Sequence, residues 1–286
     1  MTAGSSVRGA TARRSAADPT DTVASLRRRQ ARERRKRRAW AILTPVTLLV
    51  LWEIASRVGI LDDRFFPSPV NIITDSFRFV TDVRLRGELL NSLAQSGTRL
   101  AIGFLAGTIA GLIVGLAMGL HPVTRYALSG VISATYSLPK LTLFPLMIVF
   151  FGIGNMSMIA LIGLGVFFMV AINTTSGVIY SNPVYDDVAR SFELPRLVRL
   201  RLITIPAAIP SVIAGIRLGF GQALIIVVAT EFVAGNGGIG YLIWNSWQIL
   251  DVPLMFVGLA IVGLTGWLVS AGIDRLGKAL APWESD

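Results

Sequence analysis

Long apolar runs separated by short polar segments dominate the chain. An α-helix of about 18 or more apolar residues can cross a hydrocarbon core roughly 30 Å thick. Runs of this kind occupy residues 40–58, 93–120, 126–151, 156–180, 211–234 and 252–273. The pattern predicts an all-α integral membrane protein with about six transmembrane helices, whose two termini lie on the same side of the membrane.

The run at 93–120 carries a glycine at every fourth position. This spacing places the glycines on one i, i+4 ridge of a helix, where missing side chains let another helix approach backbone to backbone. We therefore expect a second helix to pack there, contributed either by this chain or by a second copy. The glycines of this ridge are Gly103, Gly107, Gly111, Gly115 and Gly119.

Polar side chains inside the runs are the candidates for a translocation path, because ionisable groups are costly in a bilayer. Lys140 follows Pro139, and a helix broken by Pro is better suited to lining a cavity than to facing lipid. Two interpretations of Lys140 are open. Its ammonium faces a solvated path or a carboxylate, or it reaches the membrane surface or pairs with a local group. Glu231 either faces the path or bonds the backbone of the glycine-rich segment 235–238. The other path candidates are Thr135, Asn173 and Gln222.

Catalytic and metal-binding chemistry has few residues available. The chain has no Cys and a single His, His121, beside a Pro in a short loop. We therefore expect no catalytic residues, no thiol nucleophile and no His-based metal site. Residues 272–278 have phosphate-loop spacing, but Ala279 stands where Ser or Thr would bind magnesium, and the segment follows a membrane helix rather than a strand. No cofactor is expected in this chain.

The net charge of +10 comes almost entirely from residues 1–38. This stretch holds twelve basic and three acidic residues, a net charge of +9, which leaves +1 for the rest of the chain. Its composition predicts a disordered tail. The basic cluster at 32–38 favours a cytoplasmic position and is able to contact anionic membrane lipid. No aromatic residues interleave with the charge, so nucleic-acid binding is not expected.

Segment 187–206 separates the fourth run from the fifth and is polar. A helix-to-helix turn takes roughly 2–8 residues, so the segment is longer than a connection requires. Val188, Phe192 and Leu197 recur at roughly helical spacing, which creates an apolar face. Because the segment is too polar to cross the membrane, contact with lipid does not explain this face. The pattern predicts a short amphipathic helix that docks a soluble partner, with Phe192 as its anchor.

The same segment resembles the hallmark of the permease subunits of binding-protein-dependent ABC importers. That hallmark is Glu-Ala-Ala, three residues, Gly, nine residues, Ile, one residue, Leu-Pro. Asp187-Val188-Ala189 matches its start, Glu193 stands at the Gly, Ile203 at the Ile, and Ile205-Pro206 at the Leu-Pro. Because Gly permits a positive φ at the turn inside this loop, Glu193 predicts a different turn, shifted towards Leu194-Pro195.

Other motifs resemble the subgroup that imports nitrate, sulfonates, taurine or bicarbonate. They lie at residues 66–69, 138–140, 150–154, 189–191 and 237–242. The resemblance covers about residues 40–280 and implies a type I ABC importer permease fold in a bacterial plasma membrane, with cytoplasmic termini. The expected organisation is a tail at 1–38, a permease domain at 39–280 that includes a cytoplasmic coupling loop at 183–206, and a C-terminal tail at 281–286.

The resemblance also implies partners. They are an ABC ATPase that binds ATP and Mg²⁺, an extracytoplasmic solute-binding protein, and a second permease copy. The solute would be small and anionic. Coupling to the ATPase would involve Asp187, Val188, Ala189, Phe192, Glu193, Leu197 and Pro206. The alternative is a stand-alone channel or secondary carrier, in which Lys140 and Glu231 would be coupling charges.

Overall fold

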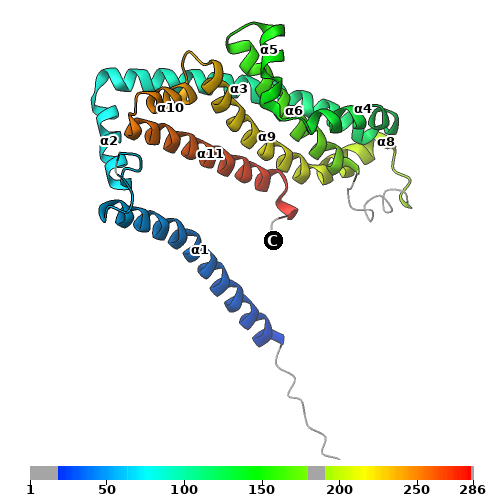
Figure 1. Ribbon diagram of the computed structural model, residues 1–286. Coiled ribbons are helices and arrows are strands. Elements are labelled where there is room, and N and C mark those ends of the chain that lie inside the picture. The colour runs from blue at the N-terminus through cyan, green and yellow to red at the C-terminus, as the bar shows by residue number, and fades with distance from the viewer. Residues whose placement is uncertain (1–18, 63, 180–190, 285–286) are drawn as a thin grey trace, which may run out of the picture. The chain divides into compact units, whose positions relative to one another are not determined.

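The computed structural model describes residues 19–62, 64–179 and 191–284, and within these ranges every regular element is a helix (Figure 1). The chain divides into two compact units, residues 1–63 and residues 64–286. The described residues contain five helices long and apolar enough to cross a membrane, or six if one bent pair counts as a single span. The expected all-α membrane fold is thus confirmed.

The first unit contains α1, Pro19–Arg57, whose part from Ala39 to Arg57 is apolar enough to span a membrane. Residues 19–38, which belong to the tail for which disorder is predicted, form the first part of this helix; residues 1–18 lie outside the described part of the chain. The physical reason is local. Ala, Leu, Arg, Gln and Glu favour helix, and Pro is well tolerated at a helix start.

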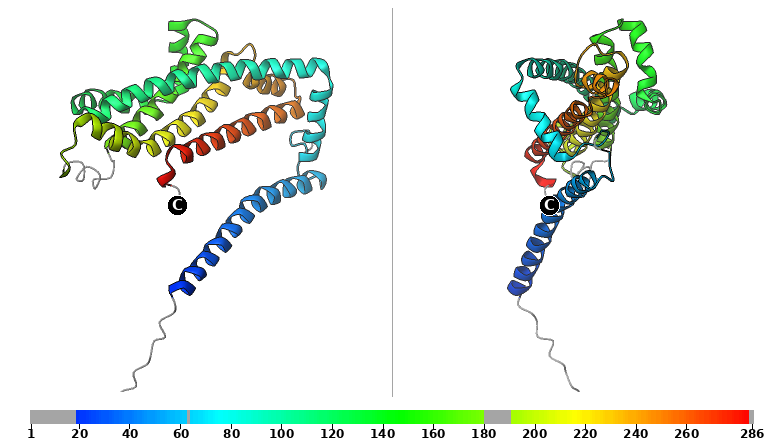
Figure 2. Two further views of the ribbon diagram at one scale, coloured as in Figure 1. Left: turned by 180° about the vertical axis from the view of Figure 1, so that it is seen from behind. Right: turned by 60° about the vertical axis from the view of Figure 1, so that its left-hand side comes forward.

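The second unit is a bundle of long helices. Its α-helices are α2 (Pro69–Thr81), α3 (Val83–Leu120), α4 (Pro122–Tyr136), α5 (Phe144–Phe151), α6 (Asn155–Ile179), α8 (Arg196–Arg199), α9 (Ile205–Ala234), α10 (Ile239–Gln248) and α11 (Val252–Leu280). Helix α6 packs between α3 and α9, and α11 packs on α9 (Figures 1 and 2). Two short elements join them, namely η1 (Lys140–Leu143) and η2 (Leu200–Thr204), and η3 (Pro282–Glu284) follows α11.

The third predicted span, 126–151, is broken into two helical arms. Residues Pro122–Tyr136 and Lys140–Phe151 meet at 98°, and α5 projects from the bundle (Figure 1). Pro139 lies at the break with no N–H to continue the helix, and it pushes the residue before it out of helical conformation. Pro145, in the first turn of α5, occupies a position that tolerates Pro.

The glycine ridge of α3 packs against α6 of the same chain. A Cβ atom added at Gly111 would lie 2.8 Å from Val170 Cβ and 2.9 Å from the carbonyl oxygen of Phe167. The other four ridge glycines meet α6 in the same manner. Thr175 Oγ1 also donates a hydrogen bond across the interface to the carbonyl of Gly115, at 3.1 Å. The partner helix that the sequence leaves open is therefore intramolecular.

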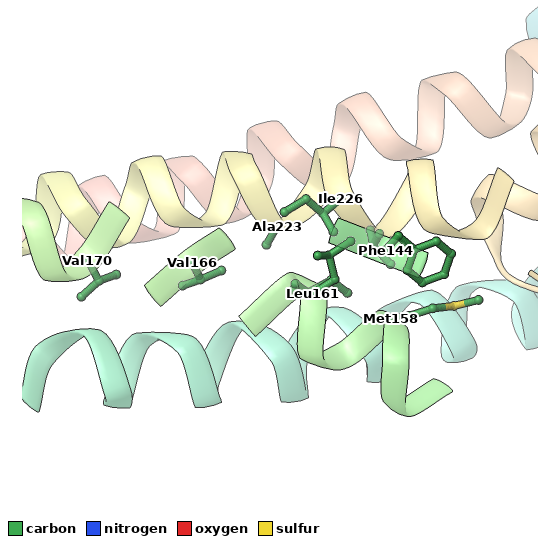
Figure 3. Close-up of a cluster of buried hydrophobic side chains, with 9 residues drawn as sticks. Phe144, Met158, Leu161, Val166, Val170, Ala223 and Ile226 are labelled. Carbon is green, nitrogen blue, oxygen red and sulfur yellow. The ribbon is translucent and has the colours of Figure 1, made fainter. Parts of the chain in front are cut away.

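The apolar core lies between α6 and α9. Leu161 and Val166 from α6 are buried against Ala223 and Ile226 from α9 (Figure 3). Phe144, at the start of α5, reaches into the same cluster and is also buried. The core thereby holds one end of the protruding arm against the bundle.

Candidate functional site

A buried ion pair joins α3 to α9. Arg99 Nη1 lies 2.7 Å from Glu231 Oε1, and the two side chains are 6% and 0% exposed. Burying two charges is costly unless they pair and their remaining hydrogen-bonding groups are satisfied. The surroundings of each group therefore decide whether the pair stabilises the fold.

The Glu231 carboxylate accepts hydrogen bonds from two further donors. Ser96 Oγ lies 2.8 Å from both carboxylate oxygens, and the backbone N–H of Gly240 donates to Oε2 at 2.8 Å. Ser96 Oγ in turn accepts from the N–H of Ile239 at 2.8 Å. A Cβ at Gly240 would lie 2.8 Å from Glu231 Cβ, so the glycine lets the backbone approach the carboxylate.

The Arg99 guanidinium is equally well satisfied. It donates to Asn155 Oδ1 at 2.8 Å, to the carbonyl of Gly237 at 2.7 Å and to Gln95 Oε1 at 3.3 Å. These bonds tie α3 to the start of α6 and to the loop between α9 and α10. The result is a charge cluster, Arg99–Glu231 with Ser96 and Asn155, in which Arg99 donates four hydrogen bonds, and it fastens one end of the bundle.

No motif in the sequence marks Arg99 as a functional residue. It is the one charged residue in the run 93–120, and Glu231 is the one acid in the run 211–234. Ionisable groups within membrane segments tend to pair with one another. The opposite charges of Arg99 and Glu231 were therefore the one feature of the sequence that could have predicted their ion pair. The predicted backbone partner of Glu231 lay at 235–238, whereas the structure has Gly240 in that role.

Lys140 lies at the break between α4 and α5. Its ammonium donates hydrogen bonds to the carbonyl oxygens of Thr135 and Tyr136. It also donates a hydrogen bond to the carbonyl oxygen of Leu138, at 2.9 Å. It also lies 5.0 Å and 5.3 Å from the ring centres of Tyr136 and Phe168. These contacts satisfy carbonyl groups that have no partner within the helix at the C-terminal end of α4. Of the alternatives given for Lys140 from the sequence, the structure has local pairing.

The other path candidates lie apart from one another. Thr135 Oγ1 donates within α4 to Val131 O at 2.9 Å. Asn173 donates within α6 to Met169 O at 2.8 Å, and a Cβ at Gly215 of α9 would lie 2.7 Å from its Cβ. Gln222 lies at the same α6–α9 interface, near Gly165. The five candidates are therefore distributed over the α4 break, the α6–α9 interface and the charge cluster.

The segment between α6 and α9 exposes apolar side chains. Asp187, Val188 and Ala189 lie outside the described residues, but Phe192 and Leu197 are 75% and 61% exposed. Leu202 is also exposed. Pro206 lines a pocket of about 300 Å³ together with Leu202, Ile203, Ala207 and Trp283. We name the described part, Ser191–Pro206, the connecting segment.

The turn in the connecting segment lies at Glu193. This residue has φ +47, one of two positive φ values among the non-glycine residues of the described chain. The prediction that the turn shifts towards Leu194-Pro195 is therefore wrong. Pro195 fixes its own φ and biases Leu194 towards extended backbone, so the left-handed residue falls before them.

We expect Glu193→Gly to stabilise the purified subunit by about 1 kcal/mol, because a side chain in left-handed backbone costs roughly 1–2 kcal/mol and Gly avoids most of that cost. Glu193→Ala is the matched control, since it removes the carboxylate and keeps the Cβ. Thermal unfolding in detergent measures both variants. A gain of equal size for Ala and Gly would show that charge, not backbone strain, is relieved.

Comparisons with known proteins show which family the chain resembles. A family model described as "Binding-protein-dependent transport system inner membrane component" matches residues 107–285. The chain is 30% identical to the putative aliphatic sulfonates transport permease protein SsuC of Bacillus subtilis, over 88% of this chain and 90% of that protein. It is 29% identical to the taurine transport system permease protein TauC of Escherichia coli, over 86% of this chain and 90% of that protein.

A solved structure shares the fold. A chain of the MetNI methionine ABC transporter, in an inward-facing conformation, superposes with a TM-score of 0.60 at 17% sequence identity. The match covers 70% of this chain and 99% of that one. The predicted type I importer permease architecture is confirmed by this likeness.

Proposed function

Because the chain belongs to the family of inner-membrane components of binding-protein-dependent transport systems, we propose that it forms the translocation path for a small anionic solute. It is the permease subunit of an ABC importer and a multi-pass membrane protein. As such it is a transport component and not an enzyme.

The observation that carries the coupling proposal is the exposed apolar surface of the connecting segment. Phe192 is exposed just before the helical stretch Leu197–Ala234, which is long and apolar enough to cross a membrane, and Leu197 is exposed at its first residue. Apolar side chains of this kind supply anchors for a protein partner. We assign this surface, with Asp187, Val188 and Ala189 before it, to contact with a partner ATPase that binds ATP and Mg²⁺.

Movement of the connecting segment would reach the solute path through α6 and α9. These helices share the apolar core, so a displacement at one end is transmitted along packed helices. Coupling requires that the ATPase contacts differ in free energy between two transporter conformations. Lys140, Thr135, Asn173, Gln222 and Glu231 remain our candidates for the path.

The relatives support the solute class. SsuC and TauC are named for aliphatic sulfonates and taurine, and a sulfonate group is anionic at neutral pH. We propose a sulfonate-, taurine- or nitrate-like solute that is delivered by an extracytoplasmic binding protein. We further propose a homodimer of this chain, with both termini in the cytoplasm and the basic cluster at 32–38 near anionic lipid. The comparisons do not favour a stand-alone channel or secondary carrier.

The Phe192→Ala variant tests the coupling surface. Truncating an anchor at the centre of an interface can cost 2 kcal/mol or more, roughly 30-fold in affinity. The full chain is co-expressed with the ATPase and the binding protein of its transport system. We expect the variant to lose most of the co-purified ATPase and the solute-stimulated ATP hydrolysis in liposomes.

Ile249→Ala is the matched control, because Ile249 is an equally apolar and exposed residue in the turn between α10 and α11. It should retain wild-type co-purification and ATP hydrolysis. Normal coupling in the Phe192 variant, or an equal loss in the Ile249 variant, would contradict the assignment of the connecting segment.

A further inference from the structure

A pocket of about 350 Å³ that is lined by both charged and apolar residues lies between α9 and α11. Arg217 of α9 and Asp274 of α11 meet across it, with Arg217 Nη1 3.0 Å from Asp274 Oδ1. Both side chains stay accessible, at 55% and 41% exposure. Lys278 also lines the pocket. Figure 2 shows the two helices running side by side.

The charges of this pocket do not cancel. Arg217 and Lys278 contribute two positive charges and Asp274 one negative charge, so the lining carries a net charge of +1. Within the described chain, Lys278 makes no hydrogen bond or ion pair, whereas the guanidinium of Arg217 is only partly used by Asp274. The pocket therefore presents unfilled N–H donors to an anion.

The depth of the pocket matches a membrane boundary. Asp274 follows Val252 by 22 residues, a helical rise of roughly 33 Å, and Arg217 precedes Ala234 by 17 residues, roughly 26 Å. The hydrocarbon core is about 30 Å thick. Trp283, exposed just beyond the pocket, has the amphipathic side chain that is enriched at membrane–water interfaces.

The walls of the pocket are apolar. Pro210, Ile213 and Ala281 surround the charged groups. A ligand that fits both surfaces has an anionic head and an adjoining apolar part. Basic pockets between transmembrane helices are suited to anionic lipid headgroups, whereas a free inorganic anion would gain nothing from the apolar walls.

We propose that Arg217 and Lys278 bind the phosphate of an anionic phospholipid at the boundary of the bilayer. The lipid would bridge α9 and α11 beside the Arg217–Asp274 ion pair. Asp274 orients the guanidinium and at the same time limits the positive charge of the site.

The proposal is tested by the thermal unfolding midpoint of the purified, delipidated full chain in detergent during titration with dioleoyl phosphatidylglycerol. Dioleoyl phosphatidylcholine and inorganic phosphate are titrated in parallel. We expect only phosphatidylglycerol to stabilise the chain at low concentration. Lys278→Gln should raise the half-saturating concentration about fivefold, the usual effect of one basic residue near an anionic lipid.

Two further variants make the test specific. Asp274→Asn should tighten phosphatidylglycerol binding, because it keeps an acceptor for Arg217 and raises the net charge of the pocket. Arg275→Gln, an exposed neighbour that does not line the pocket, should leave binding unchanged. Equal effects of Arg275→Gln and Lys278→Gln, equal stabilisation by phosphatidylcholine, or full stabilisation by inorganic phosphate would each overturn the lipid site.

Discussion

The Glu231→Gln variant is expected to lose about 3–5 kcal/mol of stability, the usual cost of removing one partner from a buried ion pair. Gln has nearly the same shape as Glu, so packing changes little. The guanidinium of Arg99, 6% exposed, would however keep its positive charge without a counter-charge. One amide group also cannot accept all the hydrogen bonds that the carboxylate accepts from Ser96, Arg99 and Gly240.

Thermal unfolding of the full chain in detergent measures this loss. Glu88→Gln is the control, since Glu88 also pairs with an arginine on α3 but is 59% exposed, and exposed pairs contribute roughly 0–1 kcal/mol. Combining Glu231→Gln with Arg99→Met should recover part of the loss, because no buried charge then remains unpaired. Equal and small effects of Glu231→Gln and Glu88→Gln would show that the cluster is not a major source of stability.

Gly111→Leu is expected to prevent close packing of α3 on α6 and to lower the unfolding midpoint strongly. Even an added Cβ would lie 2.8 Å from Val170 Cβ and 2.9 Å from a backbone oxygen of α6. Overpacking of this kind typically costs 1–3 kcal/mol or more. The backbone oxygen cannot rotate away, so the helices would have to separate and lose packing along the whole ridge.

The comparison of Gly111→Ala with Gly97→Ala isolates the cause. Both glycines lie in α3, and a Cβ at Gly97 would meet no atom of another helix within 4 Å. Ala is favoured over Gly in helices by about 1 kcal/mol, so Gly97→Ala should stabilise the chain slightly while Gly111→Ala destabilises it. Stabilisation by both substitutions would mean that α3 and α6 do not approach as closely as the structure has them.

The local pattern of apolar residues was sufficient to predict the long membrane helices. The predicted runs at 156–180 and 252–273 correspond to α6 and α11, because about twenty consecutive apolar residues satisfy their backbone hydrogen bonds in a bilayer only as a helix. The break at Pro139 also followed from one residue type. Residues 19–38 are helical for the same local reason, since they are rich in helix-forming side chains such as Ala, Leu, Arg and Gln.

Turn geometry required more than a motif. The resemblance to a family pattern drew attention to the connecting segment but misplaced its turn, because it assumed that Glu193 would not adopt a positive φ. The left-handed region is costly for a side chain, yet open to it when neighbouring residues leave no alternative.

By itself, the sequence determined the membrane class, the family and the spacing of the α3 glycines, since all three depend on residues close together in the chain. Tertiary structure alone decided that these glycines face α6, that Arg99 pairs with Glu231 across 132 residues, and that Arg217 and Lys278 line one pocket. The physical reason is that a helical pattern fixes which side chains share a face. Which two faces meet depends on packing summed over the whole bundle.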